Sequence, residues 1–227
     1  MSRSVGDVVR TLLRGLGQTL ITLGVVVLLF CVYELKITNL YTAREQDQLA
    51  DSLARTWAGP LPAAATPAAV EIGDGWAVLR IPALDRDFRQ VVVKGVGVEE
   101  LKRGPGHYPG TAEPGELGNV VLSGHRTTYG APFERFGELT PGTAVVLETR
   151  DTWFTYRIRS STIVSPTAVE VTYPVPGRPG AVPTERLLTM TTCHPKYSAR
   201  QRLIVTAELE QTLAKADGDP PVLTGQA

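Results

Sequence analysis

The stretch LLTMTTCHPKYSARQRLIV, from Leu187 to Val205, contains the pattern that decides the fold. An apolar run rich in β-branched residues ends at a single cysteine, Cys193, and a second run of the same kind opens at Arg202. Runs of this composition, bounded by turn residues, predict β-strands. Two antiparallel strands joined by a short loop bring their adjoining ends together, so we expect the thiol and the guanidinium to share one rim.

Further strand-like runs occupy the region from residue 70 to residue 213, which we predict to be the folded domain. They are short, rich in β-branched and aromatic residues, and bounded by glycine and proline. The runs are Trp76–Ile81, Phe88–Val93, Gly118–Ser123, Ala144–Thr149, Trp153–Val164, Arg186–Thr192 and Arg202–Leu209. Helical patterns are confined to two short pieces, Val98–Lys102 and Phe133–Leu139. Seven or eight short strands predict an all-β barrel or sandwich.

The N-terminal region contains an uncharged apolar run, GLGQTLITLGVVVLLFCVY, from Gly15 to Tyr33. As a helix this run would be about 28 Å long, close to the roughly 30 Å hydrocarbon core of a bilayer. A signal peptide is the alternative, but no small-residue cleavage site follows the run directly. Three arginines against one aspartate precede it, which predicts a cytoplasmic segment at residues 1–14. We therefore expect an uncleaved transmembrane helix at residues 15–33, in contact with membrane lipid, and a folded domain outside the cell.

Residues 34–69 are predicted to join the membrane span to the domain. Tyr41–Trp57 has Leu49, Leu53 and Trp57 on one helical face, which predicts a juxtamembrane helix resting on the domain or on the lipid surface. The run Gly59–Ala69 is rich in proline and alanine, so we expect an extended, semi-rigid linker.

The overall composition excludes one large class of partners. Basic and acidic residues both number 23, so the formal net charge is zero and no nucleic-acid footprint is visible. The last segment, residues 214–227, is polar and carries two adjacent prolines, which predicts a disordered tail.

The two cysteines of the chain cannot pair with one another. Cys31 lies in the predicted membrane span and Cys193 in the domain outside it. An unpaired thiol in an oxidising compartment is a liability unless it has a use. The alternative is a small buried hydrophobic residue.

A histidine is the third side chain that could take part in a reaction. In GNVVLSGHRTTYG a strand runs directly into His125. Cysteine, histidine and arginine together suit acyl transfer: the thiolate attacks a carbonyl, the imidazole protonates the leaving amine, and the cation stabilises the oxyanion. We expect a bell-shaped dependence of rate on pH, because the active form pairs a thiolate with an imidazolium.

These three segments resemble the sequence motifs of sortases. LLTMTTCHP followed by RLIV is similar to the sortase signature, in which a Thr-Leu-x-Thr-Cys strand end precedes an arginine that opens the last strand. GNVVLSGHRTTYG resembles the histidine segment of the family, and GPGHYPGTAEPGELGN the loop before it. The Cys-His-Pro step and SGHRTTYGAPF are most similar to class E sortases of actinobacteria.

The resemblance implies an eight-stranded closed β-barrel with short helices. It makes Cys193 the nucleophile, His125 the general acid and Arg202 the residue that holds the substrate carbonyl or the oxyanion. Tyr108, in the GPGHYPG loop, and Thr192 are expected to bind substrate. The implied reaction cleaves a C-terminal Leu-Ala-x-Thr-Gly or Leu-Pro-x-Thr-Gly sorting signal of secreted proteins between threonine and glycine. A thioester then passes the protein to an amine of a lipid II-type peptidoglycan precursor, without a cofactor or metal.

Three nearby residues compete for these roles. His194 adjoins the thiol, but neighbouring residues of a strand point to opposite sides. His107 sits in a turn-rich loop and is better explained as structural. Arg200 has the same strand parity as Arg202, so the pattern alone does not separate them; only the match to RLIV favours Arg202.

Other functions remain open from the residues alone. A zinc site would need close pairs of cysteine or histidine, which this sequence lacks. Glu113 and Glu116 could help to bind calcium, although two carboxylates in a turn are usually solvated. A cell-wall cysteine hydrolase would share the thiol and the histidine. A non-catalytic β-domain that binds wall polymer is the second alternative.

Overall fold

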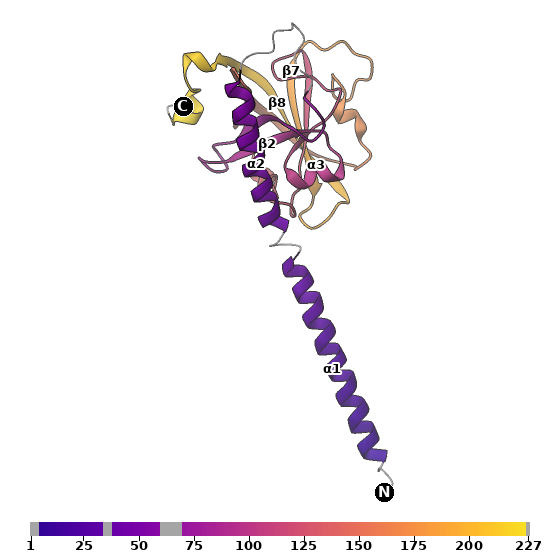
Figure 1. Ribbon diagram of the computed structural model, residues 1–227. Coiled ribbons are helices and arrows are strands. Elements are labelled where there is room, and N and C mark those ends of the chain that lie inside the picture. The colour runs from indigo at the N-terminus through magenta and orange to yellow at the C-terminus, as the bar shows by residue number, and fades with distance from the viewer. Residues whose placement is uncertain (1–4, 34–37, 60–69, 226–227) are drawn as a thin grey trace.

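The computed structural model describes residues 5–33, 38–59 and 70–225. Within them eight strands close into one barrel (Figure 1), which confirms the predicted class, in the order β1-β2-β3-β4-β7-β8-β6-β5. The pairs β2–β3 and β4–β7 are parallel and the others antiparallel. The strands are β1 Gly75–Arg80, β2 Arg89–Lys94, β3 Gly106–His107, β4 Gly118–Ser123, β5 Ala144–Glu148, β6 Thr152–Val164, β7 Arg186–His194 and β8 Gln201–Ala214.

Two long helices precede the strands, and short helices and turns join and follow them. The α-helices are α1 Val5–Val32, α2 Thr38–Ala58, α3 Val98–Arg103 and α4 Pro221–Thr224, and the 3₁₀ turns are η2 Phe136–Glu138, η3 Val169–Thr172 and η4 Lys215–Asp217. Every predicted strand is present, and the predicted helix at Val98–Lys102 is α3. The piece Phe133–Leu139 was predicted to be helical, but only η2 forms there.

The barrel interior follows the alternation of the strands. On β8, Leu203, Val205 and Ala207 belong to the central core, as their period of two predicts. On β7, Leu188 and Met190 face the same core. Residues between these positions face outward, and this parity decides which side chains lie on the surface of the barrel.

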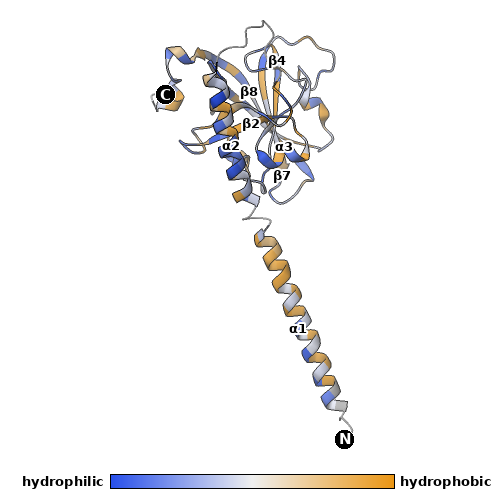
Figure 2. Ribbon diagram, viewed as in Figure 1, coloured by the Kyte–Doolittle hydropathy of each residue, from blue (hydrophilic) through white to orange (hydrophobic). Residues whose placement is uncertain are grey.

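Helix α1 is the one helix among the described residues that is long and apolar enough to cross a membrane. The qualifying stretch is Val9–Val32, and none of it is buried against the rest of the chain. Figure 2 shows apolar residues along most of its length, on a helix that extends away from the barrel. The predicted span at residues 15–33 falls within this helix and its end.

Helix α2 packs on the barrel. Of the two surfaces expected for it, the domain and the lipid, the structure shows the domain. Leu49 and Leu53 are buried against Val78, Val91 and Val93 of β1 and β2, in a second core outside the barrel. The three valines are at most 2% exposed because the helix covers them. The folded unit therefore begins with α2 rather than near residue 70, and the predicted linker residues 60–69 lie outside the described residues.

A glutamine adds polar contacts to this helix–barrel interface. The Gln46 Oε1 accepts a hydrogen bond from the backbone N–H of Val91 at 2.7 Å, and its Nε2 donates to the Val91 carbonyl at 2.9 Å. The same Nε2 donates to the Arg103 carbonyl at 2.7 Å. Buried backbone groups of β2 and α3 are thereby satisfied by α2.

The prediction of a disordered tail from residue 214 is wrong for most of that segment. The Lys215 ammonium pairs with Glu148 at 2.8 Å and lies over the rings of Trp57 and Trp153, 4.2 and 5.0 Å from their centroids. An ion pair combined with cation–π contacts orders the chain immediately after β8. The segment continues through η4 and α4 to Gly225.

His107 is an internal structural group of the barrel. Its side chain is 0% exposed and stacks on Trp76 at 4.0 Å between ring centroids. The Nε2 lies 3.1 Å from the Ala112 carbonyl, and Nδ1 has no partner among the described residues. Burial, reinforced by the positive charge of Lys94, lowers the pKa of His107 from 6.5 to about 4.

This histidine should make the fold sensitive to acid. The pKa is lowered on folding, so the neutral ring contributes stability above pH 6.5 that is lost as the pH falls towards 4. A shift of this size corresponds to about 3 kcal/mol. Urea unfolding of the full chain in detergent at pH 7.5 and pH 4.5, compared with His107→Gln, measures the effect. We expect the wild type to lose about 2.5 kcal/mol more than the variant, slightly less than the full shift because pH 4.5 is still above the folded-state pKa of about 4. Equal losses would contradict this role of His107.

Candidate active site

The residues that carry the predicted thiol and guanidinium, Cys193 and Arg202, are direct cross-strand partners. The β7–β8 ladder pairs Cys193 with Arg202, and both residues have the parity that faces outward from the barrel core. Directly opposed side chains in an antiparallel pair share a face, with Cβ atoms about 4.5–5.5 Å apart. Arg200 lies exposed in the loop before β8. The register thus separates the two arginines that the sequence pattern left equivalent.

His125 reaches the same rim from the neighbouring strand. Strand β4 runs parallel to β7, and Ser123 pairs with Thr191. His125 follows Ser123 by two residues, as Cys193 follows Thr191 by two, so both leave adjacent strands at the same level. Adjacent strands are about 4.8 Å apart. Three chemically active residues from separate segments therefore converge at one end of the barrel.

Two hydrogen bonds of the Gly124 backbone hold the histidine segment to β7. The Gly124 N–H donates to the Thr191 carbonyl at 3.2 Å, and the Thr192 hydroxyl donates to the Gly124 carbonyl at 2.8 Å. Thr192 was predicted to bind substrate, but its side chain is 2% exposed and has the inward parity. Its hydroxyl is already hydrogen-bonded to the backbone next to His125, so Thr192 stabilises the histidine segment from the interior of the barrel.

Arg126 is a site residue that the sequence prediction missed. It is only 7% exposed, and its guanidinium donates to the carbonyl of Cys193 at 3.2 Å and to that of Glu134 at 3.2 Å. Burial lowers the pKa of Arg126, while the nearby Cys193 and Glu134 favour its charged form. Nothing in the sequence signals this burial, since arginines in loops are usually exposed.

The electrostatics of the rim suit a reaction in which negative charge develops. Burial lowers the pKa of His125, whose ring lies 5.1 Å from that of Tyr129. The Arg202 Nη1 donates to the carbonyls of Ala199 and Gln201 at 2.9 and 3.1 Å. No carboxylate pairs with Arg202 in the described part of the chain. Its charge is therefore left to interact with an anion formed at Cys193.

Comparison with known proteins decides the family. The sortase domain family matches residues 79–210, more than half of the chain. The chain belongs to the sortase family. Members of this family are cysteine transpeptidases.

Class E sortases are among the relatives of this chain. Sortase SrtE1 of Streptomyces coelicolor is 37% identical over 218 residues, which is 92% of this chain and 60% of that protein, so this chain spans less than two thirds of its length. Sortase SrtE2 of the same organism is 33% identical over 91% of this chain and 85% of its own. The crystal structure of sortase E1 from S. coelicolor with a tripeptide in the active site gives a TM-score of 0.62 at 36% identity. That match covers 66% of this chain and 97% of the other.

Tyr108 lies on the same face of this sortase barrel as the thiol, but not beside it. Its N–H donates to the Val121 carbonyl at 2.9 Å, so Tyr108 stands opposite Val121, which shares the outward parity of Ser123. Strand spacings place its backbone about 13 Å along the strands and about 10 Å across them from Cys193.

The other residues considered for a metal site or for catalysis either have structural partners or lie outside any cluster of metal-binding side chains. Glu113 accepts hydrogen bonds from Lys94 at 2.6 Å and from the Trp76 indole at 2.7 Å. No group of three His, Cys, Asp or Glu that could hold a metal occurs in residues 5–33, 38–59 and 70–225. His194 has the parity opposite to Cys193, and its Nδ1 is buried.

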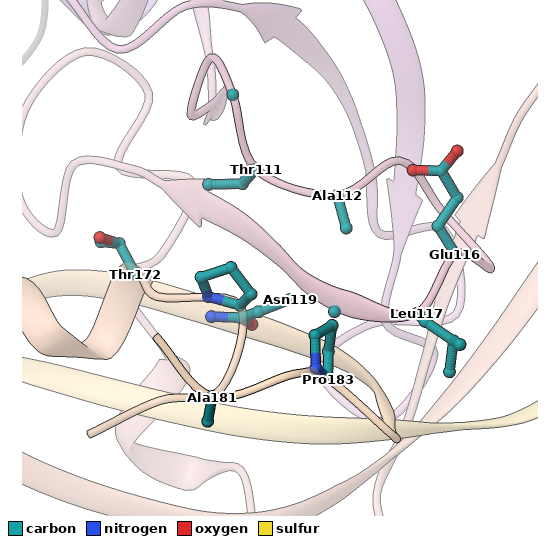
Figure 3. A pocket seen from close by; sticks show the side chains of 11 residues that line it. Thr111, Ala112, Glu116, Leu117, Asn119, Thr172, Ala181 and Pro183 are labelled. Atoms are coloured by element: carbon teal, nitrogen blue, oxygen red, sulfur yellow. The ribbon is translucent and has the colours of Figure 1, made fainter. Parts of the chain in front are cut away.

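A pocket of about 370 Å³ lies at the other end of β4 (Figure 3). Residues 110–112 and 116–119 form one wall, and residues of the β6–β7 loop, including Thr172, Ala181 and Pro183, form the other. Asn119 in this pocket pairs with Leu187, six residues before Cys193, which corresponds to about 20 Å along the strand. The pocket is therefore separate from the rim where the chemistry is placed.

Proposed function

We propose that this chain is a membrane-anchored transpeptidase in which Cys193, His125 and Arg202 carry the reaction. The observation that supports this most strongly is the pairing of Cys193 with Arg202 beside the histidine segment on β4. A nucleophile, a proton donor and a fixed cation at one rim are the groups that acyl transfer requires.

In the first half-reaction the Cys193 thiolate attacks the threonine carbonyl of a sorting signal. The carbonyl oxygen becomes an oxyanion, which Arg202 stabilises with N–H groups that its two backbone contacts leave free. As the tetrahedral intermediate collapses, the peptide C–N bond breaks and the His125 imidazolium donates its proton to the departing glycine amine. The product is a thioester between threonine and Cys193.

In the second half-reaction an acceptor amine attacks that thioester. Neutral His125 takes the proton from the amine as the new peptide bond forms, and Cys193 leaves as the thiolate. The starting charge states are thereby restored, so the cycle needs no cofactor. The lowered pKa of His125 makes its imidazolium a stronger acid, which favours donation of the proton to the leaving amine in the first half-reaction.

The substrates follow from the family rather than from a bound ligand. The donor is a secreted protein with a C-terminal Leu-Ala-x-Thr-Gly or Leu-Pro-x-Thr-Gly signal, and the tripeptide in the S. coelicolor relative supports a peptide donor. The acceptor is the amine of a lipid II-type peptidoglycan precursor. Helix α1 anchors the enzyme, and arginines at positions 3, 10 and 14 keep its N-terminus in the cytoplasm.

Product analysis distinguishes this function from that of a cell-wall hydrolase. The full chain in detergent is incubated with a Leu-Ala-x-Thr-Gly peptide, with and without triglycine as the acceptor amine. A transpeptidase forms the Thr–Gly ligated product and more of it as the amine concentration rises. Release of only the free threonine acid at every amine concentration would support the hydrolase, and no cleavage at all would support a wall-binding domain.

Tyr108 should set the preference for the second residue of the signal. Its side chain is partly exposed, and an extended donor with threonine at Cys193 covers part of the distance to it. The phenol can accept a backbone N–H from alanine but not from proline, which has none. One such bond contributes about 0.5–1.5 kcal/mol, so we expect a several-fold preference for Leu-Ala-x-Thr-Gly.

The variant Tyr108→Phe tests this role. It should reduce the ratio of kcat/KM for the alanine peptide to that for the proline peptide towards one, and leave the melting temperature unchanged. A ratio equal to that of the wild type would show that Tyr108 only packs against the barrel.

A further inference from the structure

We propose that Asn39, at the start of the juxtamembrane helix α2, is a positioning residue for the loop that carries His125. The loop runs from His125 to Phe133 and is here called the histidine loop. This inference rests on the catalytic role proposed above for His125. It assigns to α2 a function in the reaction besides that of connecting the anchor to the barrel.

The contact between α2 and the histidine loop is direct. The Asn39 Oδ1 accepts a hydrogen bond from the backbone N–H of Gly130 at 2.8 Å. One turn further along α2, the Thr42 side chain packs on the same glycine, where an added Cβ would lie 3.0 Å from the Thr42 Cγ2. Thr42 is itself fixed, because it is 2% exposed and its hydroxyl donates to the Lys102 carbonyl at 2.7 Å.

The loop adopts a backbone conformation that needs support at this point. Tyr129, Gly130 and Ala131 have φ angles of 51°, 74° and 44°, all in the left-handed region. Residues with a Cβ pay about 1–2 kcal/mol each for this conformation. Such conformations persist only where the surroundings hold them. The N–H group that donates to Asn39 belongs to Gly130, the middle one of these three residues.

The same three residues are linked to the imidazole. The Tyr129 ring is 5.1 Å from the His125 ring, measured between centroids. The Phe133 N–H donates to the His125 carbonyl at 3.1 Å, which closes the loop onto the histidine. A loop fixed at its base and held at Gly130 keeps Tyr129 against the imidazole. If the hold at Gly130 is lost, Tyr129 and His125 should sample other positions.

A loosened imidazole should slow the chemical steps more than it weakens substrate binding. Proton transfer requires the donor at hydrogen-bond distance from the leaving amine, and a misplacement of about 1 Å can cost about 100-fold in rate. We therefore expect Asn39→Ala to reduce kcat by roughly 10- to 100-fold with KM changed less than about threefold. Asn39→Asp keeps an acceptor oxygen for Gly130 and should recover most of the rate.

The experiment compares the full chain in detergent with these two variants and a matched control on the same helix. Glu45→Gln removes an ion pair from α2 to Arg103, 2.9 Å long, and does not touch the histidine loop. Steady-state kinetics give kcat and KM. The ring resonances of labelled histidine, with His125 assigned from His125→Gln, report its environment without requiring any reaction.

The expected result is a low kcat and a shifted His125 resonance in Asn39→Ala, with both restored in Asn39→Asp and both unchanged in Glu45→Gln. Wild-type values in Asn39→Ala would overturn the proposal. So would an equal loss in Glu45→Gln, which would indicate general destabilisation, or a failure of Asn39→Asp to recover. If the wild type itself transfers no peptide, the proposed function fails, while a resonance shift confined to Asn39→Ala still supports the link between α2 and His125.

Discussion

Replacing His125 with glutamine should reduce kcat about 1,000-fold, within the roughly 10²–10⁴-fold range that general acid–base catalysis contributes. Glutamine keeps a polar side chain at the rim but cannot supply a proton to the leaving amine. The fold should survive, since the loop is held by backbone contacts of Gly124 and Phe133 rather than by the imidazole. Steady-state kinetics on a Leu-Ala-x-Thr-Gly peptide measure the loss, with matched circular dichroism spectra as the control.

The pH profile adds a second readout for the same residue. The wild type should give a bell, whose rising limb has its midpoint below pH 6.5 because burial lowers the pKa of His125. The glutamine variant has no imidazolium to lose. As the pH increases, its residual rate should therefore rise as the thiolate forms and then remain constant, without a falling limb. A bell that persists in His125→Gln would assign the acid to another residue.

Replacing Arg202 with alanine should reduce kcat about 100- to 1,000-fold, the range found when one oxyanion donor is removed. Lysine should recover little of this, because a flexible ammonium does not reproduce the planar fork of N–H donors. The loop carbonyls of Ala199 and Gln201 would lose a donor, so the melting temperature of each variant is measured alongside.

Arg200 provides the matched control for Arg202. It lies two residues earlier, exposed in the loop, and does not belong to the ladder that contains Cys193. Arg200→Ala should have near wild-type kcat. A loss in Arg200→Ala as large as that in Arg202→Ala would show that the charge of the loop, rather than the guanidinium opposite the thiol, is what matters.

The parts of the site that could be predicted from the sequence are those fixed by local pairing. A hairpin brings Cys193 to the same rim as the arginines that precede the next strand, although only the register of the ladder selects Arg202, and strand parity separates Cys193 from His194. The strands themselves follow from composition and turns. The candidates for the chemistry were proposed from motifs, and each of them lies at or just beyond one end of a strand.

What escaped prediction depends on contacts between distant segments. Strand β3 has only two residues, and it forms because β2 and β4 offer backbone partners on either side. The position of α2 depends on the apolar face of β1 and β2, and the order of the tail depends on Lys215 meeting Trp57 and Glu148. The burial of Arg126 is compensated by the carbonyls of Cys193 and Glu134, which accept its hydrogen bonds and come from distant parts of the sequence or from the following loop.

The central claim, a thioester on Cys193, can be measured directly. The full chain is incubated briefly with a Leu-Ala-x-Thr-Gly peptide, quenched in acid and analysed by intact and peptide-level mass spectrometry. We predict an adduct equal to the peptide up to threonine less one water, located on the Cys193 peptide, retained in Cys31→Ala and removed by triglycine. Peptide cleavage with no adduct on Cys193, or the same adduct in Cys193→Ala, would contradict the mechanism.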